Sequence, residues 1–132
     1  MAVVLIPFLY QGEDKEINFQ ILEDDDTTPI PLTDYENIVV WFEDAGGNII
    51  EKYSREVLAL HNNADFVVVS NPLGQFKIQM RRAVTLTACV GVMKFEIKVA
   101  LTDADYTSGE YQSIAQENIF DVKYSLTGRT TI

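Results

Sequence analysis

The chain has 132 residues, of which 47% are hydrophobic and 23% are charged. This much apolar material excludes a disordered chain and a coiled coil, and the length is that of one domain over residues 1–132. With 10 Lys and Arg against 20 Asp and Glu, the net charge is −10. Such a surface repels the phosphates of nucleic acids and the anionic faces of membranes, so we expect neither as a partner.

Residues 1–10 are apolar apart from Pro7. The run has no basic start and no small-residue cleavage site, so we do not expect a signal peptide. It is also about half as long as a membrane span, so we do not expect it to cross a membrane. A strand that is apolar on both faces must be covered on both faces, and an uncovered edge pairs with other chains. We therefore expect an apolar lead strand that lies in a subunit contact; the alternative is a first strand buried in its own domain. The expected interface residues are Val3, Val4, Leu5, Ile6, Phe8 and Tyr10.

The dominant period along the chain is two, which is the period of a half-buried strand. Apolar and polar residues alternate first over residues 17–21. Residues 38–42 (IVVWF) are apolar on both faces and predict a central strand, with Trp41 packed in the core. Residues 44–48 contain two glycines and predict a tight turn into a return strand over residues 49–53.

A second hairpin is predicted by residues 66–70, a turn at residues 71–74, and alternation over residues 76–80. The clearest alternation covers residues 93–101, with Lys94, Glu96 and Lys98 on the polar face. A closing strand is predicted at residues 120–124. About seven strands at this spacing are typical of a β-sandwich.

Helical patterning is limited to two short runs, residues 56–60 and residues 82–89. Thr85 and Thr87 weaken the second run, because β-branched residues are poor helix formers. Neither run is long enough to carry the fold. The expected fold class is therefore all-β.

Charge is distributed unevenly along the sequence. Residues 11–26 hold seven acidic side chains against Lys15, whereas residues 77–98 hold five basic side chains against Glu96. Opposite patches on one domain permit head-to-tail contact between copies, and an ordinary solvated surface is the alternative.

Catalytic residues are scarce. His61 is the only histidine and has no nucleophile motif beside it, so we interpret it as a surface or loop histidine. Cys89 is the only cysteine, which excludes an internal disulfide and a zinc site built from cysteines. We expect Cys89 to be a small, buried and unreactive side chain, and we do not expect an enzyme.

Two groups of carboxylates, residues 23–26 and residues 103–105, are the candidates for a calcium site. Neither has the spacing and central glycine of an EF-hand loop, and solvated acidic loops have the same composition. No phosphate-binding glycine motif is present. We therefore expect no metal and no cofactor.

The order of these features follows a recognisable plan over residues 12–125. The matching pieces, in chain order, are residues 14–22, residues 30–33 (IPLT), the strand-turn-strand of residues 38–50, residues 90–99 and residues 119–123. In this order the sequence resembles the N-terminal immunoglobulin-like domain of phage baseplate upper proteins and related phage tail-fibre and virion proteins.

The resemblance implies an immunoglobulin-like antiparallel β-sandwich of about seven strands. It implies a non-enzymatic bacteriophage virion structural protein, in the tail or baseplate, the collar or the head decoration, assembled in the cytoplasm of the host bacterium. Its partners would be other virion proteins and copies of itself. The alternative function is a carbohydrate-binding β-sandwich module, for which the candidate exposed aromatic residues are Tyr53, Tyr106 and Tyr111.

Overall fold

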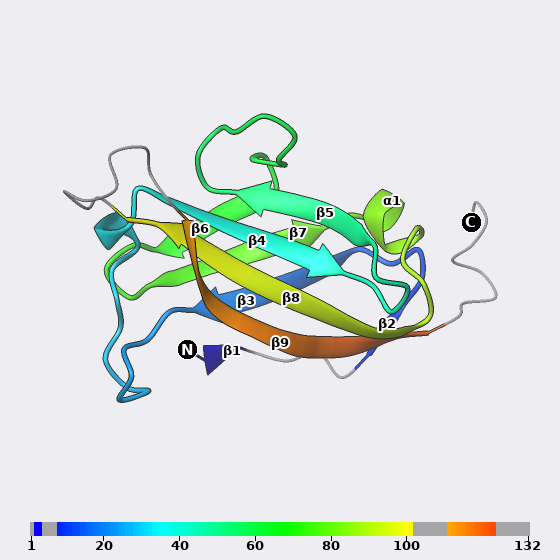
Figure 1. Ribbon diagram of the computed structural model, residues 1–132, viewed down its shortest axis with the longest axis horizontal. Coiled ribbons are helices and arrows are strands. Elements are labelled where there is room, and N and C mark those ends of the chain that lie inside the picture. Colours follow the sequence, from blue (N-terminus) through cyan, green and yellow to red (C-terminus); the bar gives the residue numbers. More distant parts are fainter. Residues whose placement is uncertain (1, 4–7, 102–110, 124–132) are drawn as a thin grey trace.

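A computed structural model of the chain describes residues 2–3, 8–101 and 111–123, which form an all-β sandwich of two sheets (Figure 1). The strands in these ranges are β1 (Ala2–Val3), β2 (Phe8–Tyr10), β3 (Lys15–Gln20), β4 (Asn37–Glu43), β5 (Ile49–Ser54), β6 (Phe66–Ser70), β7 (Gln75–Met80), β8 (Gly91–Ala100) and β9 (Tyr111–Lys123). Two single helical turns accompany them, η1 (Leu32–Asp34) and α1 (Arg82–Thr85). The all-β sandwich that the sequence predicts is confirmed.

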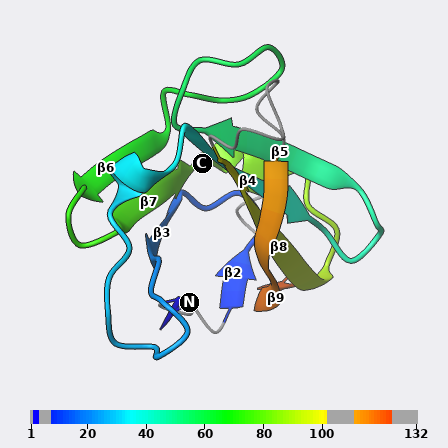
Figure 2. The ribbon, with the colours of Figure 1, turned by 60° about the vertical axis from the view of Figure 1, so that its left-hand side comes forward.

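The strand order is that of an immunoglobulin domain. One sheet has the order β1-β3-β7-β6 and the other has the order β2-β9-β8-β4-β5. Lettered along the chain, with β1 and β2 as the two parts of the first strand, these orders read A-B-E-D and A′-G-F-C-C′. Every pair of strands is antiparallel except β2 and β9, which are parallel. Figure 2 shows the two layers from the side.

The apolar lead divides between the two sheets. Ala2 and Val3 pair with β3, whereas Phe8 to Tyr10 pair with the end of β9. Tyr10 is 39% exposed. Of the expected interface residues, Val4, Leu5 and Ile6 lie outside the described residues. The described parts find their backbone partners within the same chain, and the subunit contact of this segment stays a prediction.

The core lies between the sheets and is built mainly from the inward residues of β3 to β9. Its largest fully buried side chains are Ile17, Ile21, Leu32, Ile38, Phe42, Tyr53, Phe76, Ile78, Met80, Met93 and Phe95. The rings of Phe66 and Phe76 stack at 4.7 Å, and those of Phe76 and Phe19 stack at 5.2 Å. Phe19 then meets Phe95 of the other sheet edge-on at 5.3 Å. Aromatic contacts therefore join the two sheets.

Three sequence expectations about local structure differ from the structure. The closing strand begins at Tyr111 rather than near residue 120, because residues 111–118 form a solvated strand whose side chains are mostly polar. Residues 56–60 form an irregular loop and not a helical turn. The second helical run is present, but only as the four residues of α1.

The turn between β6 and β7 requires glycine at position 74. Gly74 has φ +66°, and a Cβ atom there would lie 2.5 Å from the carbonyl oxygen of Ile30 and 2.7 Å from that of Ile21. The Gly74 carbonyl also accepts a hydrogen bond from the Ile21 amide at 2.9 Å. This turn is therefore packed directly against the chain that follows β3.

Replacing Gly74 with alanine is expected to lower the free energy of unfolding by about 2 kcal/mol or more, because left-handed strain adds to a clash with two carbonyl groups. Gly47→Ala is the matched control: Gly47 has φ +80°, but its nearest contact would be Glu43 Oε1 at 3.9 Å. Strain alone predicts a loss of about 1 kcal/mol for that variant. Urea unfolding measures both, and equal losses would show that the close approach carries no energetic weight.

Tyr53 of the edge strand β5 is fully buried in the core, where its ring meets Phe42 edge-on at 5.7 Å. Its hydroxyl group is buried and has no hydrogen-bond partner among the described residues. Burial raises the pKa of Tyr53 above its usual value, and the charges of Glu51 and Asp65 raise it further. The expectation that Tyr53 is an exposed aromatic residue is therefore wrong, because the pleat of β5 turns its side chain inward, opposite Val40.

We expect Tyr53→Phe to raise the free energy of unfolding by about 1 kcal/mol, because the variant buries no unpaired hydroxyl. Above about pH 10 the unfolded chain loses the Tyr53 proton while the folded chain keeps it, so wild-type stability falls as pH rises. The variant removes this contribution, and its advantage over wild type grows between pH 9 and 11. Urea unfolding at several pH values tests both effects, and a destabilised variant would contradict them.

Candidate functional site

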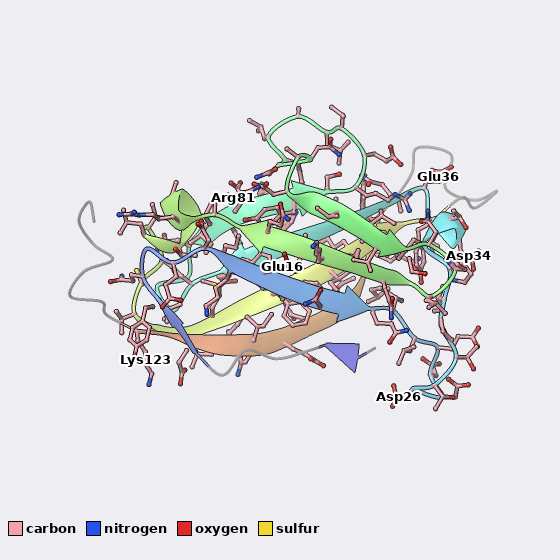
Figure 3. All side chains as sticks on the ribbon, turned by 180° about the vertical axis from the view of Figure 1, so that it is seen from behind. Glu16, Asp26, Asp34, Glu36, Arg81 and Lys123 are labelled. Carbon is pink, nitrogen blue, oxygen red and sulfur yellow. The ribbon has the colours of Figure 1, made fainter. Side chains whose placement is uncertain are left out.

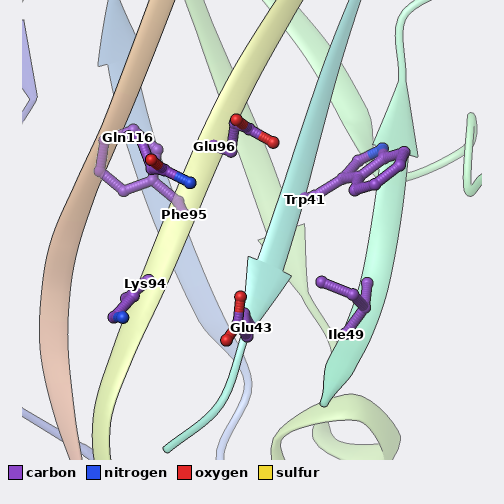
Figure 4. Close-up of a pocket in the computed structure, with 7 residues that line it drawn as sticks. All are labelled: Trp41, Glu43, Ile49, Lys94, Phe95, Glu96 and Gln116. Carbon is purple, nitrogen blue, oxygen red and sulfur yellow. The ribbon is translucent and has the colours of Figure 1, made fainter. Parts of the chain in front are cut away.

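The outer face of the five-stranded sheet carries the single tryptophan of the chain (Figure 4). Trp41 projects outward from β4, opposite Lys52 of β5 and Glu96 of β8, and is half-buried. The Nζ atoms of Lys52 and Lys98 lie 4.4 Å and 4.1 Å from the centroid of its ring. The predicted core position of Trp41 is therefore wrong: the pleat of β4 sends Ile38, Val40 and Phe42 inward and Trp41 outward.

His61 supports Trp41 from the loop that follows β5. The indole Nε1 of Trp41 donates a hydrogen bond to His61 Nε2 at 3.3 Å, and His61 Nδ1 lies 2.9 Å from the Ala59 carbonyl oxygen. This arrangement requires the imidazole to be neutral with its hydrogen on Nδ1. The Asn62 amide pins the loop by donating to the Lys52 carbonyl at 2.7 Å. His61 is a loop histidine, as the sequence predicts, and it positions the indole.

The lysines around Trp41 differ from most other cations of the chain. Within the described ranges, Lys52 and Lys94 have no carboxylate within 4.0 Å, whereas Lys98 lies 3.5 Å from Glu96. The basic side chains that have an acidic partner elsewhere are Lys15, Arg55, Lys77 and Arg81. In a chain with twice as many acids as bases, two cations without a partner therefore share one face with the tryptophan. We call Trp41, Lys52, Lys94 and Lys98 the lysine face.

Two hollows lie on this face. The smaller has a volume of about 30 Å³, room for little more than one water molecule. It is lined by Trp41, Glu43, Ile49, Lys94, Phe95, Glu96 and Gln116. The second has a volume of about 390 Å³ and is lined by Glu43, Lys94, Gln116, Glu117 and Asn118, all exposed except half-buried Glu43.

The basic residues of residues 77–98, considered as a possible patch, do not share one surface. Lys77 and Arg81 lie by the four-stranded sheet, where they pair with Glu16 at 3.2 Å and Asp65 at 3.0 Å. Figure 3 shows Arg81 and Glu16 on this rear side. The other two lysines of the segment stand on β8 in the second sheet. The chain crosses between the sheets through α1, which separates the cations onto two faces.

The loop of residues 23–26, which we call the acidic loop, projects from the end of the sandwich with Asp26 near its tip (Figure 3). The Asp25 carboxylate accepts hydrogen bonds from the Thr28 hydroxyl and from the amides of Thr28 and Thr27, which lower the pKa of Asp25 to about 2. In the part of the chain that the structure describes, no three His, Cys, Asp or Glu residues are placed to hold a metal ion. The second candidate group, residues 103–105, lies outside that part.

Cys89 is exposed, so its predicted burial is wrong. It lies in the connection from α1 to β8, where its amide donates a hydrogen bond to Asp44 Oδ2 at 3.1 Å. The hydrogen bond between the two side chains and the negative charge of Asp44 raise the pKa of the Cys89 thiol. A raised thiol pKa is the opposite of what an activated nucleophile needs.

The two described aromatic residues among those proposed for carbohydrate binding, Tyr53 and Tyr111, do not form a platform. Tyr106 lies outside the described residues, and Tyr53 is buried. Tyr111 is 37% exposed, and its hydroxyl accepts a hydrogen bond from Asn37 Nδ2 at 3.0 Å. The sequence pattern does not identify Trp41 as a surface aromatic residue, because Val39 on the same face of β4 is also apolar and the strand shows no alternation. Its ring already carries two ammonium groups, which oppose the stacking of a sugar.

The sequence matches no protein-family model, and it matches no curated protein. Among the described residues, no helix has the length and apolar character needed to cross a membrane.

We expect His61→Ala to lower the free energy of unfolding by about 1 kcal/mol and to shift Trp41 fluorescence to longer wavelength, because the indole loses its acceptor and gains solvent. His61→Gln retains a side-chain acceptor and should restore part of both effects. Urea unfolding followed by tryptophan emission measures them, and Trp41 is the only tryptophan. Unchanged emission in the alanine variant would contradict the supporting role of His61.

Proposed function

We propose that this chain is a non-enzymatic structural protein of a bacteriophage particle, in which it binds neighbouring virion proteins. The order of its sequence features, which resembles immunoglobulin-like domains of phage baseplate and tail proteins, supports the proposal. The A-B-E-D and A′-G-F-C-C′ strand orders agree with that resemblance. The tail or baseplate, the collar and the head decoration are the places in the particle where such a domain would serve.

The observation that carries the proposal is the lysine face. Lys52 and Lys94 lack a carboxylate partner in the described structure. Lys52 lies over the ring of a half-buried tryptophan that His61 holds, and Lys94 lines the small hollow beside that tryptophan. Tryptophan is enriched among the residues that contribute most of the binding energy in protein–protein contacts. The strands below it are held by the core, so the face needs little ordering when a partner binds.

Docking by such a face gives weak single contacts. Its hollows are shallow and its charges are exposed, so each contact contributes little by itself. In a particle the domain is present in many copies, and linked contacts raise the overall affinity without new interactions. We propose copies of the chain and other virion proteins as the partners, with assembly in the cytoplasm of the host bacterium.

Particles of the phage that encodes the chain provide the test. Mass spectrometry of purified particles is expected to detect the chain, and a cryo-electron microscopy map is expected to show the sandwich in repeated copies with neighbours against it. The major capsid protein is the positive control for recovery. Presence of the chain in infected cells together with its absence from purified particles would contradict the proposal.

A further inference from the structure

We infer that the lysine face of one copy binds the acidic loop of a second copy, so that copies assemble head to tail. This inference rests on the proposed docking function and names the partner of the same face. The site is the surface of Trp41, Lys52, Lys94 and Lys98, and the occupant is the exposed loop of residues 23–26.

The lysine face favours a carboxylate. Two ammonium groups lie within 4.4 Å of the centroid of one indole ring, and only that of Lys98 has a carboxylate partner, Glu96. Together with Lys94, the face holds three cations, and the carboxylates that line its two hollows are those of Glu43, Glu96 and Glu117, none of which lies within 4.0 Å of Lys52 or Lys94. An incoming carboxylate therefore meets Lys52 without displacing an existing ion pair. Elsewhere, an acidic segment would compete with the partners that Lys15, Lys77 and Arg81 already have.

The acidic loop has the shape and charge that this face accepts. Its four residues are consecutive, acidic and exposed. Asp25 holds the backbone of the loop through Thr27 and Thr28, so the loop is already ordered before it binds. The side chains of Glu23 and Asp24 make no ion pair or hydrogen bond with the described residues. The loop projects from the body, as the position of Asp26 shows in Figure 3, so its exposed carboxylates are accessible to a second copy.

The two surfaces belong to different layers of the sandwich. The acidic loop follows β3 in the four-stranded sheet, whereas the lysines stand on the outer face of β5 and β8 in the five-stranded sheet. The two patches form no ion pair with each other within the described structure. Contact between them in two copies is heterologous, and its repetition gives a ring or a filament. Since each copy has a net charge of −10, long-range repulsion keeps a single contact weak.

Charge exchange between two variants tests the inference. The face variant is K52E/K94E, and the loop variant is E23K/D24K, which leaves Asp25 and its hydrogen bonds intact. Sedimentation velocity over a range of concentrations measures association, and the emission of Trp41 reports on the face itself. We expect wild type to associate, and each variant alone to do so about tenfold more weakly, the effect of two exposed ion pairs. An equal mixture should recover association, since the unmodified loop of the face variant meets the unmodified lysine face of the loop variant, and the reversed charges form the complementary contact at the other end.

The control K15E/K77E changes the net charge by the same amount, but on the four-stranded sheet. It should associate as wild type does, and circular dichroism should show that every variant is folded. A wild-type chain that stays monomeric at about 1 mM, a mixture without recovery, or equal weakening in the control overturns the inference. These results leave the proposed function standing if the chain is present in particles, where its partner would then be a different protein.

Discussion

Three phenylalanine rings from β6, β7 and β3 stack on one another, and the last of them, Phe19, meets Phe95 of the opposite sheet edge-on. Each of these rings buries a large apolar area, and the stack runs along the inner face of the four-stranded sheet, while the contact of Phe19 with Phe95 joins it to the other sheet. The pairing of the strands therefore has to place all four rings in the same layer. Once that condition is met, the pleat determines the direction of all the remaining side chains of these strands.

The outward face is a consequence of this inward packing. Phe95 and Ile97 point into the core, so Lys94, Glu96 and Lys98 must point out of it. A slip of one residue in the pairing of β4 and β8 would bury the lysines and expose the core, which makes this register strongly specified. The site thus gains a rigid base from residues that never touch a partner.

Loops complete the face by satisfying buried backbone groups. Arg55 follows β5 and donates hydrogen bonds to the carbonyl groups of Leu32 at 2.6 Å and Tyr35 at 2.7 Å. These bonds hold the start of the loop that carries His61 to Trp41. A connection between the two sheets therefore also orients the side chain on which the proposed docking depends.

Local periodicity was sufficient for much of the fold. Alternation predicted the strands around residues 17–21 and 93–101 and the polar direction of Lys94 and Lys98, because the side-chain period of a strand is local. The hairpins of residues 38–53 and 66–80 were equally legible, since glycine and proline mark their turns. In these regions, one face is apolar enough to identify the core without knowledge of the partner strand.

Other features depended on contacts between distant segments, which local patterns do not encode. Val39 and Trp41 have the same apolar character, yet the loop and neighbouring strands bury one and leave the other half-exposed. The solvated first half of β9 forms a strand only because β8 supplies its hydrogen-bond partners. The sequence by itself determined an acidic all-β domain and the faces of its strands. Tertiary pairing decided which cations share a surface, which sheet each half of the apolar lead joins and where Trp41 points. The reason is that the burial of a side chain depends on what lies opposite it.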